Sequence, residues 1–108
     1  IFPIVHGVRA LALENNLPQS NTFERLVVLA DKELLESQLA HDAAEALGFL
    51  LHMRLKAGLD ALAHGRKPNN LIAPDKLSTL DRDLLKDALA VVKRFKVAMR
   101  HHFKISGF

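Results

Sequence analysis

The chain has 108 residues, which is the size of one domain and enough to bury a hydrophobic core. It contains no cysteine, which excludes disulfides, thiolate catalysis and cysteine-based zinc sites and suits a cytoplasmic location. The mild net charge of +3 and the absence of Trp and Tyr argue against a dedicated nucleic-acid binder, and the apolar stretches are well short of the roughly 20 residues that span a bilayer, which argues against a membrane protein.

The first two predicted elements are helices. One runs from about Ile4 to Asn15, and the next from about Thr22 to Lys32, where Asn21 and Glu24 form a capping box. Apolar residues at helical spacing predict the buried face of each helix. These residues are Ile4, Val8, Leu11 and Ala12 in the first helix, and Phe23, Leu26, Val27 and Ala30 in the second.

The third predicted helix is the longest, from about Leu34 to His64, with Gly65 as its C-terminal cap. At about 100° per residue, Arg54 projects into the apolar arc of this helix. A guanidinium cannot lose its proton to escape burial, so it needs a carboxylate, a set of carbonyls or an anionic ligand. The arc itself consists of Leu39, Ala43, Leu47, Leu50, Ala57 and Ala61.

Two interpretations of Arg54 stay open. One is a structural ion pair, with Glu24 or Glu14 as the candidate partner. The other is a guanidinium held between helices to bind a phosphate or a carboxylate. Arg9 favours the second interpretation, because it lies at the edge of the buried arc of the first helix.

A loop from Arg66 to Pro74 leads to the fourth predicted helix, from about Thr79 to Phe103, where Ser78 and Asp81 give a second capping-box signal. Its predicted buried residues are Leu84, Ala88, Val91, Val92, Phe95 and Met99. A basic stripe runs along the opposite side: Arg82, Lys86, Lys93, Lys96, Arg100 and Lys104. We interpret the stripe as a solvated outer face, the alternative being a surface for nucleic acid, an acidic partner or a substrate phosphate.

The four helices predict an all-α, antiparallel (up-and-down) four-helix bundle forming one domain over residues 1–108.

No catalytic or metal-binding signature stands out. His41, Glu45 and His52 share one helical face, but a third ligand is not evident and a polar solvent face is the favoured interpretation. Arg94 and His101 match the loose Arg-x(4–6)-His pattern of the helical ribonucleases known as HEPN domains, a pattern expected about once by chance in such a chain. The sequence has no Gly-rich phosphate loop, and no Gly-Ser followed by Asp-x-Asp. We therefore predict no catalytic residue and no metal site in this chain.

An ordered set of motifs over nearly the whole chain resembles one bacterial family, the putative nucleotidyltransferase substrate-binding domain. The motifs are Phe2-Pro3-Ile4-Val5-His6-Gly7-Val8-Arg9-Ala10-Leu11-Ala12-Leu13, Asn21-Thr22-Phe23-Glu24-Arg25-Leu26, Leu51-His52-Met53-Arg54-Leu55, Pro68-Asn69-Asn70, Leu77-Ser78 and Leu84-Leu85-Lys86. The polar positions in those motifs, and hence the substrate-binding candidates that the resemblance implies, are Arg9, Asn21, Thr22, Glu24, Arg25 and Arg54.

The resemblance implies a non-catalytic bundle packed against a nucleotidyltransferase domain that precedes it in the same chain. The catalytic partner would supply the magnesium carboxylates and bind Mg²⁺ and a nucleoside triphosphate, so we expect no cofactor in this chain. Cyclic-nucleotide-binding or CBS regulatory domains accompany such proteins, which implies a role in signal transduction. The chain begins at Ile1 without a methionine, and we expect a C-terminal fragment of a larger multidomain protein. The alternatives to this function are a helical dimerisation or protein-interaction module, including a homodimer, and a HEPN-like ribonuclease.

Overall fold

The computed structural model describes residues 1–65 and 77–105, so the predicted loop over 66–74 lies outside the described residues. The described part is all-helical, with no strand: α1 (Phe2–Glu14), α2 (Thr22–Asp31), α3 (Ser37–Ala63) and α4 (Thr79–Ile105). This confirms the predicted all-α class. The arrangement is compatible with an antiparallel bundle, because α1 packs against α2 and α4, and α3 packs against the same two helices.

The helix ends follow from local chemistry. Asn21 Oδ1 accepts hydrogen bonds from the backbone N–H groups of Phe23 (2.8 Å) and Glu24 (3.3 Å), which confirms the predicted cap of α2. Ser78 Oγ accepts from Asp81 N–H at 3.1 Å at the start of α4. Gly65, at φ +70°, follows the end of α3 as predicted.

The third helix begins later than predicted, at Ser37 instead of Leu34. The reason is the way α2 ends: Glu33 adopts φ 57°, and the N–H of Leu34 bonds back to the carbonyl of Leu29 at 2.9 Å. This pattern is a Schellman motif, which reverses the chain before a new helix can start. Such ends usually carry glycine, so a glutamate at this position gave no sequence signal.

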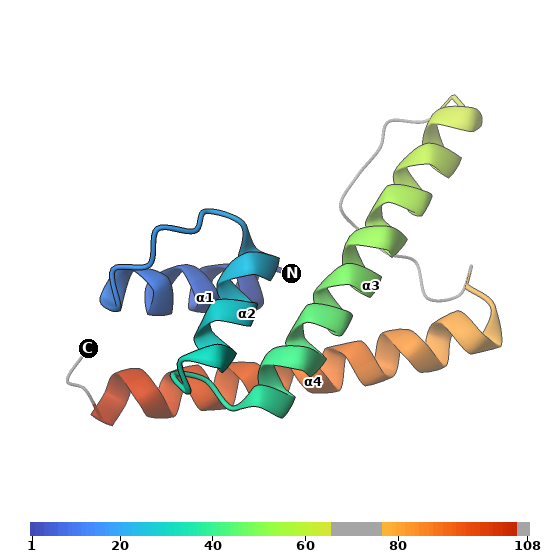
Figure 1. Ribbon diagram of the computed structural model, residues 1–108. Helices are drawn as coiled ribbons and strands as arrows, with labels where there is room; N and C mark the ends of the chain where they lie inside the picture. The colour runs from blue at the N-terminus through green and yellow to red at the C-terminus, as the bar shows by residue number, and fades with distance from the viewer. Residues whose placement is uncertain (66–76, 106–108) are drawn as a thin grey trace.

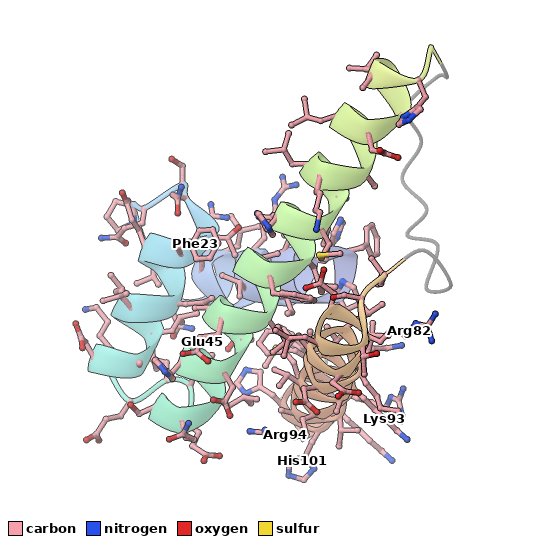
Figure 2. All side chains as sticks on the ribbon, turned by 90° about the vertical axis from the view of Figure 1, so that its right-hand side faces the viewer. Phe23, Glu45, Arg82, Lys93, Arg94 and His101 are labelled. Carbon is pink, nitrogen blue, oxygen red and sulfur yellow. The ribbon has the colours of Figure 1, made fainter. Side chains whose placement is uncertain are left out.

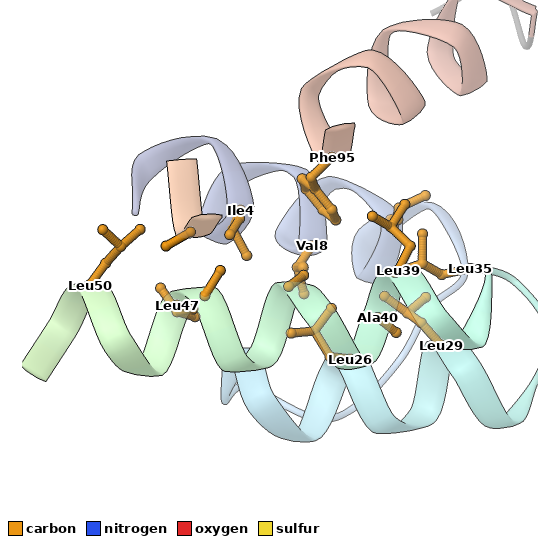
Figure 3. Close-up of a cluster of buried hydrophobic side chains, with 14 of the residues drawn as sticks. Ile4, Val8, Leu26, Leu29, Leu35, Leu39, Ala40, Leu47, Leu50 and Phe95 are labelled. Atoms are coloured by element: carbon orange, nitrogen blue, oxygen red, sulfur yellow. The ribbon is translucent and has the colours of Figure 1, made fainter. Parts of the chain in front are cut away.

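One hydrophobic core joins all four helices (Figure 3). Ile4 and Val8 of α1, Leu26 and Leu29 of α2, and Phe95 of α4 are almost fully buried within it. The predicted face of α1 is confirmed, whereas that of α2 is partly wrong. Val27 is 61% exposed and Phe23 is 38% exposed, and Leu29 takes the central position, because this short helix turns a different edge toward α3.

The long helices α3 and α4 lie together only over part of their length. The C-terminal half of α3 rises away from α4 in both views (Figures 1 and 2). Met53 is the last residue of α3 that is buried, and none of the described residues 54–63 is. The last ten of the 27 residues of α3 therefore lie outside the buried core.

Candidate functional site

Arg54 lies on α3 directly after Met53, at the point where the helix leaves the core. Its side chain is half-buried, and no charged residue is buried anywhere in residues 1–65 and 77–105. The prediction that Arg54 lies within the buried face is therefore wrong. The apolar pattern of α3 continues beyond Met53, and Asp81 at the start of α4 still contacts Lys56 at 3.5 Å. No residue of 54–63 is buried, however, so the arc that contains Arg54 stays partly open to solvent.

The predicted ion-pair partners of Arg54 are engaged elsewhere or exposed. Glu14 Oε1 lies 2.8 Å from His102 Nε2 of α4, and Glu24 is exposed at the start of α2. Within the described part of the chain, Arg54 has neither a hydrogen bond nor an ion pair. A half-buried guanidinium with no partner retains its full capacity to bind an anion.

The charge of Arg54 acts on the beginning of α1. Burial, and then the positive charge of Arg54, lower the pKa of the Ile1 amino group. Figure 1 shows the start of α1 between the start of α2 and the middle of α3. The free N–H groups of a helix N-terminus carry partial positive charge. Arg54 thus places a positive charge near the start of α1, whereas the first N–H groups of α2 are capped by Asn21 and Glu24 adds a negative charge there.

The other substrate-binding candidates divide into two groups. Asn21 and Arg25 hold the backbone: Asn21 caps α2, and Arg25 Nε donates to the carbonyl of Gln19 at 2.7 Å, which closes the connection between α1 and α2. Thr22 is half-buried in the first turn of α2, and Glu24 is exposed beside it. These four residues lie at one end of α2, which Figure 1 places near the start of α1.

Arg9 is exposed on α1, eight residues after Ile1. At 1.5 Å per residue, this places Arg9 about 12 Å along the helix from the end that Arg54 approaches. Arg9 therefore lies about two turns along α1 from the end that Arg54 approaches.

The basic stripe of α4 is exposed along its whole length, as a solvated outer face should be. In Figure 2, which looks nearly along α4, Arg82 and Lys93 project from the flank that faces away from α3. The stripe is therefore separate from Arg54, which lies on α3.

The remaining candidates form no site. His41 Nε2 pairs with Glu45 at 3.0 Å and His52 is exposed; no group of three metal-ligating side chains occurs within 1–65 and 77–105. Arg94 Nη2 lies 3.2 Å from Asp42 Oδ2, and this ion pair occupies one of the two residues that the ribonuclease alternative requires. None of the helices in the described ranges is long and apolar enough to cross a membrane.

A second feature was missed by the sequence analysis although its signal was present. Four leucines recur at intervals of four, four and three residues along the outer part of α3, and each is between 37% and 62% exposed. We call this set the leucine face: Leu51, Leu55, Leu59 and Leu62. Soluble monomers seldom leave such a contiguous apolar surface uncovered unless it binds something.

Comparison with known proteins gives one family. A family model described as a putative nucleotidyltransferase substrate binding domain matches residues 1–103. No curated protein and no solved structure matches the chain.

Proposed function

The chain belongs to the family of putative nucleotidyltransferase substrate binding domains, and from this premise we propose that it forms the substrate-binding side of the cleft of a nucleotidyltransferase. It would perform no catalysis itself. The nucleotidyltransferase domain that the family name implies would supply the metal-binding carboxylates, Mg²⁺ and the nucleoside triphosphate. In this proposal the protein works in the bacterial cytoplasm as part of a signalling protein, with cyclic-nucleotide-binding or CBS domains as its regulators.

The observation that supports this proposal best is Arg54, a half-buried guanidinium without a partner among the described residues, beside the starts of α1 and α2. Its role would be to bind an anionic group of the substrate or nucleotide. Arg9 would bind a more distant part of the same ligand. Asn21 and Arg25 would act indirectly, because they fix the start of α2, while Thr22 and Glu24 would line the interdomain surface.

The test is a titration of this chain, together with a nucleotidyltransferase domain, with ATP and with UTP in the presence of Mg²⁺. Arg54→Met should weaken nucleotide binding about tenfold or more, because a charge-assisted hydrogen bond contributes about 1.5–3 kcal/mol. It should leave the free energy of unfolding nearly unchanged, since no ion pair is lost. Lys104→Met, which removes an exposed charge at the far end of α4, is the matched control and should bind normally. A variant that unfolds easily but binds normally would make Arg54 a structural residue.

The leucine face favours a second candidate function, a protein-interaction module. Its four side chains would bind the nucleotidyltransferase domain, or a second copy of the chain, by burial of apolar surface. Leu55→Glu and Leu59→Glu should abolish that association. Association that survives both substitutions would remove this candidate.

A further inference from the structure

A groove of about 280 Å³ runs between α3 and α4, on the side of α4 that faces away from the basic stripe. Its floor is apolar, and three carboxylates border it. The floor is formed by Ala46, Phe49, Leu84, Ala88 and Val91, and the border by Asp42, Glu45 and Asp87. Neither the family description nor the Arg54 site accounts for this groove.

The border remains negative after its own ion pairs are counted. Asp42 is paired with Arg94 at 3.2 Å and accepts a hydrogen bond from Gln38 at 2.9 Å. Glu45 is paired with His41, which is charged only when it is protonated. Asp87 has no hydrogen bond and no ion pair with any residue in the described ranges. Three carboxylates thus face one permanently charged guanidinium, in a chain whose net charge is +3.

The matching surface is on the same molecule. The basic stripe carries six Lys and Arg side chains on the opposite flank of α4, where Figure 2 shows Arg82 and Lys93. Leu89 lies within the stripe at helical spacing and is 53% exposed. An apolar side chain ringed by cations is the complement of an apolar floor ringed by carboxylates.

We propose that the groove between α3 and α4 binds the basic stripe of α4 from a second copy of this chain. Leu89 of one copy would lie on the apolar floor of the other, and the lysines beside it would face Asp87 and Glu45. The two surfaces lie on opposite flanks of α4, so the contact is heterologous and joins copies head to tail. This proposal is independent of nucleotide binding at Arg54.

The test is sedimentation velocity of the chain over a concentration series. Self-association should weaken strongly between 0.05 and 1 M NaCl, because the Debye length falls from above 10 Å to about 3 Å. Asp87→Lys should raise the dissociation constant about tenfold or more, since it replaces an attraction by a repulsion. Asp83→Lys is the matched control: it makes the same charge change one turn earlier on α4, outside the groove, and should associate normally.

A mixing experiment separates this contact from any other. Lys93→Glu/Lys96→Glu disables the stripe, and Asp87→Lys disables the groove, so each variant alone should be monomeric. Mixed together, they retain one intact groove and one intact stripe and should form a 1:1 heterodimer. A chain that is monomeric at millimolar concentration in low salt would overturn the proposal. The proposal would also be overturned by an association that strengthens with salt, persists in Asp87→Lys and is lost in Leu59→Glu. Such an association would come from the leucine face.

Discussion

Gly7 provides a sharp test of how α1 packs on α4. It is a buried residue in the interior of α1, where glycine lowers helix stability by about 0.5–1 kcal/mol relative to alanine. An added Cβ would lie 2.6 Å from Cε1 of Phe95 and 2.9 Å from Cγ of Met99. The Phe95 ring is fully buried and has no free space to move into, whereas the more flexible Met99 can adjust.

Gly7→Ala should therefore be destabilising. Overpacking of this kind raises the free energy of the folded state by about 1–3 kcal/mol, and the gain in helix propensity offsets only part of it. We expect a net loss of about 1–2 kcal/mol in the free energy of unfolding, which lowers Tm by roughly 5–10 °C in a chain of this size. Urea and thermal unfolding followed by circular dichroism measure both quantities.

Gly48→Ala is the matched control, because Gly48 lies in the interior of α3 and a Cβ there would have no atom within 4 Å. This variant should be more stable than wild type by about 0.5–1 kcal/mol. If Gly7→Ala raises the free energy of unfolding as much as Gly48→Ala does, then α1 and α4 do not pack as closely at Gly7 as described above. Phe95→Leu in the Gly7→Ala background should recover part of the loss, which a double-mutant cycle would measure.

Two further predictions test the helix cap of α2 and one charged contact of α3. Asn21→Ala should lower the free energy of unfolding by about 1 kcal/mol, and Asn21→Gly by only a few tenths, as measured by urea titration. The hydrogen bond from Gln38, and then the contact with Arg94, hold the pKa of Asp42 below its ordinary value. The ionised carboxylate therefore stabilises the fold fully above the unfolded-state pKa of about 4, and this effect is lost as the pH falls through the lower folded-state pKa. Asp42→Asn should be less stable than wild type at pH 7, and urea titrations should show this difference shrinking as the pH falls through the lowered pKa of Asp42.

The parts of the fold that were predictable from the sequence are those governed by neighbouring residues. The caps at Asn21, Ser78 and Gly65 involve contacts within about one turn, and each is where its residue type indicates. The start of α3 was placed less well, at Leu34 instead of Ser37, because Glu33 adopts a left-handed conformation that its residue type disfavours. The backbone bonds that close this turn, such as the one from the N–H of Leu34 to the carbonyl of Leu29, involve no side chain and therefore give no sequence signal.

Burial depends on distant residues, and there the sequence was a weaker guide. The apolar arc of α3 continues through Ala57 and Ala61, so the pattern alone indicated a core that extends along the whole helix. In the structure the buried part of α3 ends at Met53, although Asp81 of α4 still contacts Lys56 (Nζ to Oδ2, 3.5 Å). The pattern does show that something covers that arc, but it cannot distinguish a helix of the same domain from a partner. The predicted burial of Arg54 was too deep for this reason.

Arg54 and the leucine face lie on the same turns of α3, and this leads to a prediction about the assembled protein. A domain that docks on the leucine face would remove water from around Arg54, and desolvation of an unpaired charge opposes docking by several kcal/mol. An anionic ligand on Arg54 would offset this penalty, so docking and ligand binding should be positively coupled. Titration of the nucleotidyltransferase domain with this chain should show tighter docking in the presence of nucleotide. Arg54→Met should dock more tightly than wild type without nucleotide, and nucleotide should no longer change its affinity. Equal docking of both proteins under both conditions would mean that Arg54 stays in water and takes no part in the interface.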